Sequence, residues 1–343
     1  MPLSDFDYDL PPELIAQQPL ATRDRSRMLV VDRTKGRFED KHFTDLPLYL
    51  RRGDVVVVNN TKVFPARLIG KTETGAALEI FLVRDLGGGE WETLARPGKR
   101  LKPGKRLLFG DILRAETVRK TDDGKVIVRF DAGKRFDELI DQLGITPLPP
   151  YIKRDATDID TDHERYQTVY ATRRGAIAAP TAGLHFTPDI LQKIRDAGIA
   201  IAEITLHVGY GTFEPVRVED LSEHKVLAES YEIDDFTAQL LNDAKRAGNR
   251  IVAVGTTTTR ALESNTAKFD SFTAGRHLAD LTITRGYNFA AIDALLTNFH
   301  LPKSSLLILT STFGGHELIM KAYRHAVAAK YRFYSYGDCM FIF

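Results

Sequence analysis

Three histidines and one glutamate stand in glycine-containing segments where they could transfer a proton. His185 is in residues 178–188, His207 and Glu214 share residues 205–216, and His300 is in residues 295–306. An imidazole titrates near neutral pH, and burial can move a carboxylate toward it, so both types suit general acid–base catalysis. We rank His185 and His300 first. A hydrogen-bonded core histidine is an equal alternative for His185, because Leu184 and Phe186 flank it.

Hydroxyl, amide and basic side chains accompany these groups in four segments, each directly after a predicted strand. Such loops bind ligands in open α/β sheets. The third segment, residues 254–264, could seat an anion at a helix N-terminus or be an ordinary capped helix start. The glycine pair of the second resembles a dinucleotide loop only loosely. The candidate binding residues are Pro180, Thr181, Gly183, Gly209, Tyr210, Gly211, Thr212, Phe213, Gly255, Thr256, Thr257, Arg260, Thr297, Asn298, Lys303 and Ser304.

Alternating strands and helices must position these segments. The apolar β-branched run 54–60 predicts a strand buried on both faces, and a hairpin is predicted around Thr34 to Gly36. Further strands are predicted at 199–206, 249–255, 281–287, 293–300 and 339–343, and helices at 187–198, 235–248, 304–312 and 317–331. This alternation predicts an α/β sheet that strand 54–60 joins.

Residues 66–150 have a different character. Short β-prone pieces alternate with glycine-containing turns, and no long helical period interrupts them, which is typical of a small β-barrel. A proline-rich stretch, residues 145–153, closes the segment. We therefore predict an α/β domain from residues 1–65 plus 151–343, with residues 66–150 inserted as an all-β barrel.

A dense group of cations lies within this β-rich segment. Proline and glycine keep it in turns, so its side chains cannot all enter a core. Such a face could neutralise nucleic-acid phosphates, and an ordinary solvated hairpin is an equal alternative. The group consists of Arg96, Lys99, Arg100, Lys102, Lys105 and Arg106.

Composition excludes several classes of protein. The 343 residues contain 47 Lys and Arg against 46 Asp and Glu, a net charge of +1, which excludes a histone-like polycation. The single cysteine excludes an internal disulfide and a cysteine-based zinc cage, and it fits a reducing cytoplasm. No signal peptide or membrane span is recognisable. We expect no bound metal.

The four segments together resemble one known family. The sequences AAPTAGLHFT, TLHVGYGTFEPV, VGTTTTRALES, DALLTNFHLPKSSL and YRFYSYGDCMFI are similar, in order, to those of the S-adenosylmethionine:tRNA ribosyltransferase-isomerases. GDVVVVNNTKVFPARLIG, PLPPYIKR and ERYQTVYA extend the resemblance over nearly the whole chain. The departures are small: TTTTR, LTITRGY and STFGG replace family segments of different composition, and no histidine, lysine or acid of interest is lost.

The resemblance implies an activity and a fold. The family transfers and isomerises the ribosyl group of S-adenosylmethionine onto 7-aminomethyl-7-deazaguanine at the tRNA wobble position. The products are epoxyqueuosine-tRNA, adenine and methionine. S-adenosylmethionine is consumed as a substrate, so no cofactor is implied. The implied fold is a barrel-like α/β domain carrying an inserted β-barrel.

This reaction assigns hypothetical roles. His185, His207 or His300 would remove a proton beside the sulfonium, and Glu214 would hold the sulfonium or act as a second base. Thr256, Thr257 and Arg260, or Lys303 and Ser304, would bind the methionine carboxylate or a tRNA phosphate. Residues expected to face or close the cleft are Asn59, Asn60, Thr61, Arg67, Tyr336 and Asp338.

Three alternatives remain. A base-exchanging tRNA transglycosylase would need an aspartate nucleophile and usually a zinc site. A non-catalytic tRNA-binding protein on the same scaffold would be expected to lose some of the polar residues that all four segments keep. A methyltransferase is disfavoured because the usual glycine-rich loop is absent. We expect a cytoplasmic monomer with tRNA and S-adenosylmethionine as partners and no membrane contact.

Overall fold

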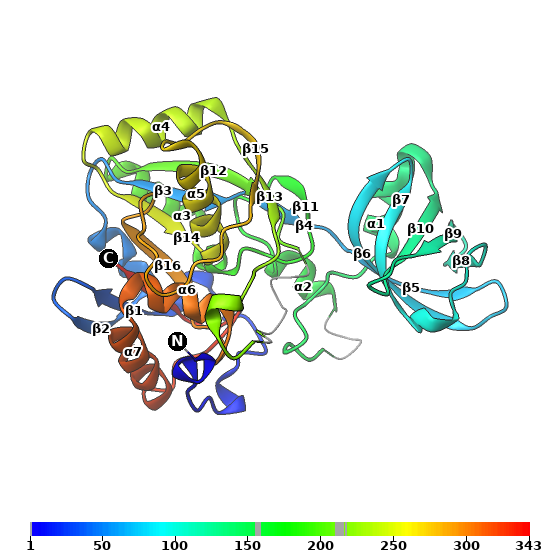
Figure 1. Ribbon diagram of the computed structural model, residues 1–343, viewed down its shortest axis with the longest axis horizontal. Helices are drawn as coiled ribbons and strands as arrows, with labels where there is room; N and C mark the ends of the chain where they lie inside the picture. The colour runs from blue at the N-terminus through cyan, green and yellow to red at the C-terminus, as the bar shows by residue number, and fades with distance from the viewer. Residues whose placement is uncertain (1, 155–158, 210–215, 217) are drawn as a thin grey trace.

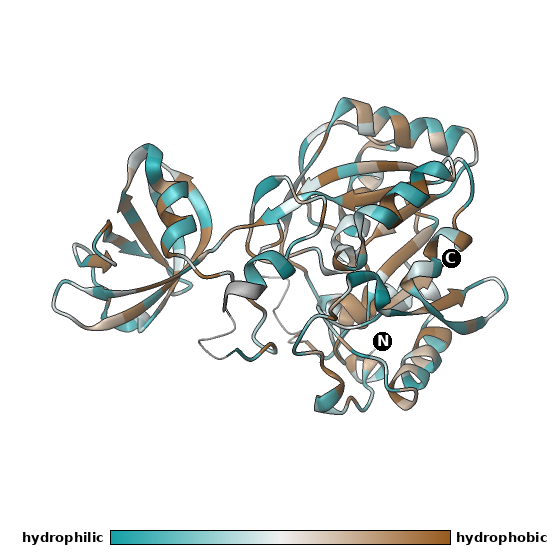
Figure 2. Ribbon diagram, turned by 180° about the vertical axis from the view of Figure 1, so that it is seen from behind, coloured by the Kyte–Doolittle hydropathy of each residue, from teal (hydrophilic) through white to brown (hydrophobic). Residues whose placement is uncertain are grey.

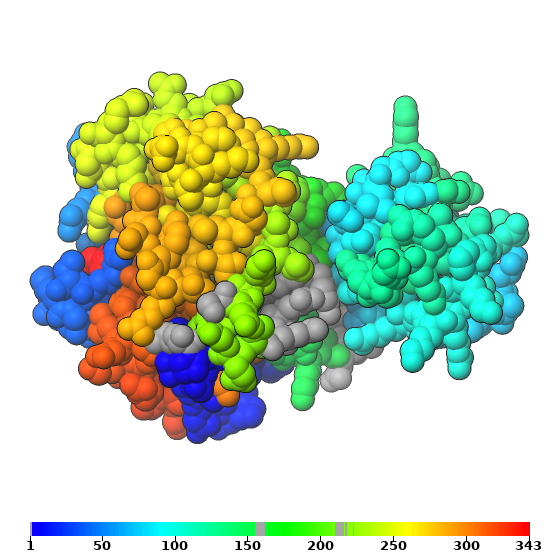
Figure 3. Space-filling model, in the orientation of Figure 1, coloured from blue at the N-terminus to red at the C-terminus, as the bar shows by residue number. Residues whose placement is uncertain are grey.

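The chain forms a large α/β part and a smaller β-barrel, joined by two neighbouring connections (Figure 1). The computed structural model describes every residue except 1, 155–158, 210–215 and 217. Both chain termini lie in the α/β part, whereas the barrel forms a separate lobe beside it (Figure 3). This arrangement agrees with the predicted fold class. No helix among the described residues has the length and apolar character that crossing a bilayer requires.

A nine-stranded mixed sheet is the centre of the α/β part. Its order is β15-β13-β12-β3-β14-β16-β17-β1-β2. The strands β12, β3, β14 and β16 run parallel to one another. Their bounds, with the remaining strands of the sheet, are Arg27–Asp32 (β1), Arg37–His42 (β2), Val55–Asn59 (β3), Ala200–Leu206 (β12), Glu229–Ile233 (β13), Ile251–Val254 (β14), Gly275–Ala279 (β15), Ala294–Asn298 (β16) and Cys339–Ile342 (β17).

The predicted valine run is confirmed as a central strand. In β3 every residue is buried, and alternate valines enter different cores. Val55 and Val57 join the core beneath helices α4 to α7, whereas Val56 and Val58 join the core beneath helix α3. The two faces of the sheet are therefore both covered, as a continuous β-branched run requires.

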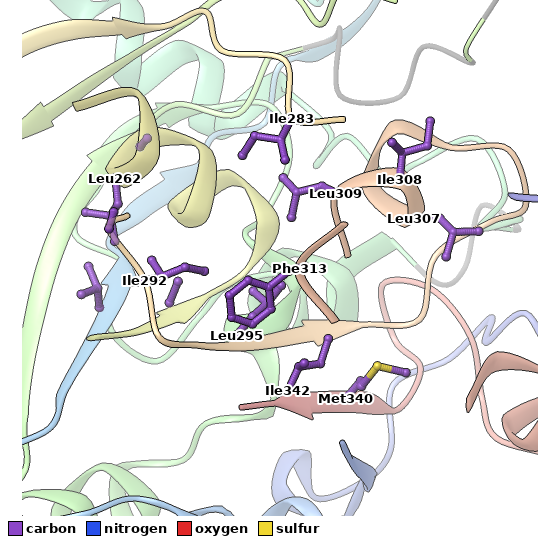
Figure 4. Packing of buried hydrophobic residues seen from close by; sticks show 14 of the residues in the cluster. Leu262, Ile283, Ile292, Leu295, Leu307, Ile308, Leu309, Phe313, Met340 and Ile342 are labelled. Carbon is purple, nitrogen blue, oxygen red and sulfur yellow. The ribbon is translucent and has the colours of Figure 1, made fainter. Parts of the chain in front are cut away.

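Helices cover both faces: the four predicted helices are present, and α5 begins in the segment 254–264, where a helix start was one of two interpretations. They are Pro188–Asp196 (α3), Asp235–Arg246 (α4), Thr256–Phe269 (α5), Ser305–Gly314 (α6) and His316–Ala328 (α7). Thr187, Asp234 and Ser304 cap α3, α4 and α6 by accepting backbone N–H groups. Leu309 and Phe313 of α6 lie over the sheet beside Leu295 and Met340 (Figure 4). The strands are mostly apolar, and the outer helices alternate between polar and apolar residues (Figure 2).

The barrel is closed by six antiparallel strands in the order β10-β7-β6-β5-β8-β9. Its interior is apolar, with Leu68, Ile80, Leu107 and Val128 fully buried. The elements are Arg67–Thr72 (β5), Ala77–Gly87 (β6), Glu90–Arg96 (β7), Arg106–Phe109 (β8), Leu113–Lys120 (β9), Val126–Asp131 (β10) and the helix Phe136–Leu143 (α1). The sequence did not predict α1, whose Leu139 and Ile140 pack into the barrel core.

Three further elements lie outside the large sheet and the barrel, and one predicted strand is wrong. Thr61–Val63 (β4) pairs with Arg173–Ala176 (β11), and Ile159–Arg165 (α2) precedes β11 in the chain. Residues 281–287 form no strand, contrary to prediction. The edge position is taken instead by β15, whose alternation of small, basic and apolar residues gives a weak strand signal.

Candidate active site

A cavity opens where several strand ends meet, and its empty space, including the solvent at its mouth, is about 620 Å³. Its walls come from the segment before η7 (Thr181–His185), from the ends of β14 and β16, and from the segment after α7. All four predicted polar segments contribute to its wall. Three of them contribute predicted binding residues, and the segment 205–216 contributes Val208. The members of the predicted set that line it are Pro180, Thr181, Gly255, Thr256, Thr257, Thr297, Asn298 and His300.

His300 is held at the end of β16 by contacts that leave its ring on the cavity wall. Its Nε2 atom is 2.9 Å from Thr297 Oγ1. Its backbone N–H donates to Tyr323 at 3.0 Å, and its carbonyl accepts from the Tyr8 hydroxyl. Only 7% of the residue is exposed, and burial lowers the pKa of His300 to about 3. The ring is therefore neutral at physiological pH.

The N-terminus of α5 presents the second polar wall. Gly255 has φ +92°, which favours glycine, and it supplies no capping side chain. Thr258 and Thr259 donate back to carbonyls of the preceding turn, whereas Thr256 and Thr257 line the cavity. The positive end of a helix dipole and two hydroxyl groups therefore meet there, which suits a carboxylate or phosphate.

Aromatic side chains form the remaining wall, and sequence reasoning did not single them out. Tyr151, Tyr166 and Tyr334 line the cavity together with Ser335. Tyr151 and Tyr334 meet edge to face with centroids 3.8 Å apart, and the Tyr151 hydroxyl bonds to Ser335. Burial raises the pKa of all three phenols, so they are uncharged. The motifs that contain these tyrosines were visible, but their position in the cavity was not.

His185 lies beside this cavity and opens onto another. It lines a second cavity of about 300 Å³ with Ser26, and its Nδ1 atom is 2.8 Å from Ser26 Oγ. Burial lowers the pKa of His185 to about 4, while the neighbouring Asn298 side chain acts in the opposite direction. Gly183 belongs to the same turn, where a Cβ atom would lie 2.0 Å from the Tyr170 hydroxyl.

Residues 59–61 and their neighbours do not line the cavity. Asn59 joins β3 to β12 through Leu206, accepting its N–H at 3.0 Å and donating to its carbonyl at 2.9 Å. Asn60 bonds to Glu203 and Thr205, and Thr61 Oγ1 is 2.7 Å from His207 Nδ1. These contacts give the three residues 59–61, and also His207, structural partners outside the cavity. Arg67 pairs with Glu79 in the barrel at 3.0 Å.

Five other predicted residues also have partners away from the cavity. Arg260 pairs with Glu229 at 3.1 Å and lines a third cavity on the far side of Thr256 and Thr257. Gly209 donates its N–H to Glu229 at 3.0 Å. Lys303 pairs with Asp7 at 2.6 Å, because the turn before α6 directs it outward. Ser304 caps α6, and Asp338 accepts two backbone N–H groups.

Tyr336 lines the second cavity rather than closing the first. Its hydroxyl donates to Asp162 at 2.8 Å. Five further predicted residues lie outside the part of the chain that the structure describes, so their roles stay predictions. They are Tyr210, Gly211, Thr212, Phe213 and Glu214.

The predicted basic segment lies on the barrel surface. Arg96 ends β7, Lys99 and Arg100 form a short turn, and Arg106 begins β8. All are exposed except Lys105, which is half-buried. Within the described residues only Arg106 of the six makes an ion pair, with Glu73 at 3.5 Å. The other five cations of this basic segment (Arg96, Lys99, Arg100, Lys102 and Lys105) have no neutralising carboxylate there.

This chain is similar to known proteins over its whole length. The family model described as queuosine biosynthesis protein matches residues 3–342. The S-adenosylmethionine:tRNA ribosyltransferase-isomerases of Symbiobacterium thermophilum and Natranaerobius thermophilus are each 50% identical, over 344 and 345 residues. These alignments cover 100% of this chain and 100% and 99% of the relatives.

A solved structure gives the same result. The crystal structure of an S-adenosylmethionine tRNA ribosyltransferase from Thermotoga maritima is 37% identical, with a TM-score of 0.56. The comparison covers 99% of this chain and 100% of that one. These similarities extend over the whole length of the chain. This chain belongs to the queuosine biosynthesis protein family.

Proposed function

We propose that the protein transfers and isomerises the ribosyl group of S-adenosylmethionine onto 7-aminomethyl-7-deazaguanine at the wobble position of tRNA. The products are epoxyqueuosine-tRNA, adenine and methionine. Full-length identity of about one half to enzymes named for this activity supports the assignment. The observation that carries it is the single cavity to which His300, Thr256 and the tyrosines contribute from distant parts of the chain.

The aromatic wall suits the sulfonium of S-adenosylmethionine. A cation is attracted to the faces of aromatic rings, and the attraction strengthens where water is excluded. Among the described residues that line the cavity there is no carboxylate. Tyr151 and Tyr334 are therefore the side chains through which we expect the positive sulfur to be held, and the role of Glu214 stays a prediction.

The α5 end of the cavity suits the opposite charge. Thr256 and Thr257 offer hydroxyl groups beside unshared backbone N–H groups of the first turn. An α-carboxylate would accept hydrogen bonds from these groups and interact with the helix dipole. We therefore orient S-adenosylmethionine with its methionine end toward α5 and its sulfur toward the tyrosines.

His300 is our candidate for the base that removes the proton beside the sulfonium. It lines the same cavity, its ring is neutral, and Thr297 orients it. A base with so low a pKa is weak, so catalysis also depends on the sulfonium, which acidifies the adjacent carbon. His185 faces the second cavity, and His207 contacts Thr61, so both are less well placed.

The barrel is our candidate tRNA-binding domain. The basic segment carries five exposed or half-buried cations without an ion pair among the described residues, as phosphate recognition requires. We place the boundaries of this inserted domain at 66–150, with 1–65 and 151–343 as the catalytic domain. We further propose a cytoplasmic monomer that carries no cofactor and no metal.

Product analysis tests the assignment directly. The protein is incubated with labelled S-adenosylmethionine and tRNA bearing the aminomethyl-deazaguanine, and nucleosides are analysed by mass. We expect epoxyqueuosine in tRNA with equimolar free adenine. tRNA binding without adenine release would favour the non-catalytic alternative, and release of guanine from tRNA would favour base exchange.

A further inference from the structure

Two arginines, Arg23 and Arg165, line the second cavity, and the proposed function gives neither of them a role. This cavity neighbours the candidate active site, because Ser335 lines both cavities. Its walls bring together Arg23, Ser26, Arg165 and His185 from three distant segments of the chain. No carboxylate is among the residues that line it.

The arginines of this cavity are held by backbone groups and not by acids. Arg23 donates from Nη1 to the carbonyl of Gln167 at 2.8 Å. Arg165 donates to the carbonyl of Ala21 at 3.2 Å and to that of Leu20. Neither guanidinium makes an ion pair with a described residue, and the buried Nε atom of Arg165 has no described hydrogen-bond partner. Both side chains are thus fixed in place without a direct ion pair, and the carboxylate of Glu164 acts on Arg23 only from a longer distance.

His185 adds a polar atom whose hydrogen bonding is incomplete. The residue is 4% exposed and lines the cavity, and its Nδ1 atom is paired with Ser26. Its Nε2 atom is buried and makes no hydrogen bond of ordinary geometry with a described residue, although the Asn298 side chain is near enough to raise the pKa of the ring by hydrogen bonding. When the Ser26 hydroxyl donates to Nδ1, Nε2 carries the proton and becomes a donor that Asn298 satisfies incompletely. A buried donor of this kind destabilises the protein until an acceptor forms a full hydrogen bond with it.

We propose that the second cavity binds an oxyanion carried by one of the two substrates, through Arg23, Arg165 and the Nε2–H group of His185. Naming the substrates rests on the proposed function, whereas the oxyanion chemistry does not. Two sources fit: a phosphodiester of the tRNA beside the reacting nucleotide, and the α-carboxylate of S-adenosylmethionine, which would then lie here and not at α5. Guanidinium groups suit both, because their fork of N–H donors matches two oxygens of a planar or tetrahedral anion.

The histidine provides a probe of occupancy. Burial lowers the pKa of His185 to about 4, and the positive charges of Arg23 and Arg332 lower it further. An oxyanion that accepts from Nε2 compensates those charges and raises the pKa. Occupancy therefore changes the titration of one ring while leaving His300, on the other cavity, nearly unchanged.

Inorganic phosphate is the first test ligand. Protein labelled with ¹⁵N-histidine is titrated with phosphate at constant ionic strength, and the His185 ring is followed by NMR. We expect a saturable shift in the parent, loss of saturation in Arg165→Gln, and saturation retained in Arg33→Gln. Arg33 is a matched control, because it is also half-buried and donates to the carbonyls of Phe313 and Asp293. The absence of a saturable shift in the parent would overturn the proposal.

Substrate affinity then distinguishes the two sources. Because Arg165→Gln removes a charge-assisted hydrogen bond, it should weaken the binding of one substrate about tenfold or more relative to Arg33→Gln. Loss of tRNA affinity with a salt dependence reduced by about one counterion identifies the phosphodiester. Loss of S-adenosylmethionine affinity identifies the carboxylate.

If Arg165→Gln and Arg33→Gln bind tRNA equally and also bind S-adenosylmethionine equally, the second cavity is not a substrate site. Arg165→Lys keeps the positive charge but removes the planar set of N–H donors, so it provides a second variant if Arg165→Gln does not fold. The proposed function is judged separately by product formation in the parent. A parent that binds phosphate but forms no product would remove that function and leave the oxyanion site in place.

Discussion

The α/β part and the barrel differ in where they keep their polar side chains. The α/β part buries His185, Asn298 and His300 between its sheet and the segments that cover it. The barrel fills its interior with residues such as Leu68 and Ile80, while its cations stay at the surface. Burying a polar group costs free energy that only a specific arrangement of partners offsets. The α/β part is therefore suited to catalysis, whereas the barrel presents its positive charge at the surface.

Of the changes considered, removal of His300 from the α/β part should have the largest effect on the reaction rate. We expect His300→Ala to lower the single-turnover rate by about 100- to 10,000-fold, as for the loss of a general base, with tRNA affinity unchanged. His325→Ala is the control, because this half-exposed ring pairs with Asp40 outside the cavity. A rate within about threefold of the parent would exclude His300 as the base.

Acid should destabilise the α/β part through its buried histidines. The native pKa values of His185 and His300 are lowered to about 4 and about 3 from 6.5, so the unfolded chain binds more protons below pH 6.5. Their stabilising contribution is complete above that pH and decreases as the pH falls. For each ring the expected decrease approaches about 1.4 kcal/mol per pH unit well below pH 6.5 and is about half as steep at pH 6.5, where the unfolded ring is half protonated; urea unfolding between pH 6.5 and 5 measures it.

A variant isolates this contribution. His185→Gln should reduce the slope of stability against pH by about half of the histidine contribution, whereas His325→Gln should leave it nearly unchanged. A parent whose stability stays constant or rises between pH 6.5 and 5 would show that the two rings are not buried in the neutral form.

Charge reversal on the barrel should affect RNA binding alone. We expect Lys99→Glu with Lys105→Glu to weaken tRNA binding about tenfold and to reduce its salt dependence by about one counterion per lost contact. The affinity for S-adenosylmethionine should stay the same. Lys193→Glu with Lys321→Glu makes an equal charge change on exposed helix positions of the α/β part. Equal losses in both pairs would mean that net charge, and not the barrel surface, determines affinity.

The smallest expected effect concerns the aromatic wall. Tyr334→Leu should weaken S-adenosylmethionine by about three- to tenfold, because cation–π attraction contributes about 0.5–2 kcal/mol. Tyr334→Phe keeps the ring face and should bind nearly as the parent does. Isothermal titration with S-adenosylmethionine measures both. If Leu and Phe bind equally, the ring does not hold the sulfonium.

The sequence predicted those elements whose local signals agree with the final packing. The strands β3, β12, β14 and β16 combine mainly apolar residues, β-branched in β3 and β14, with a central position in the sheet, so composition and burial indicate the same structure. At β15 they disagree, because an edge strand needs few apolar residues. The segment 281–287 shows the opposite error, since a β-prone composition there is not matched by a strand partner.

Site prediction had a similar limit. Thr256, Thr297 and His300 were found because residues after parallel strands converge at one edge of a sheet. Tyr151 and Tyr334 were missed as cavity residues, because they come from irregular segments that only tertiary packing directs inward. Asn59 and Lys303 have residue types suited to binding, but their hydrogen bond and ion pair are long-range contacts that spacing does not reveal.

The chain enters and leaves the barrel at a single point. Arg67 and Ile145 exchange two backbone hydrogen bonds, at 2.8 and 3.2 Å, so the outgoing and returning segments are already side by side. Excision of residues 68–144 would thus leave two ends that a short glycine-containing turn can bridge without stretching either flank. The α/β part could be prepared as a minimal unit in this way, and its reaction with a free nucleobase could be compared with its reaction on a full RNA.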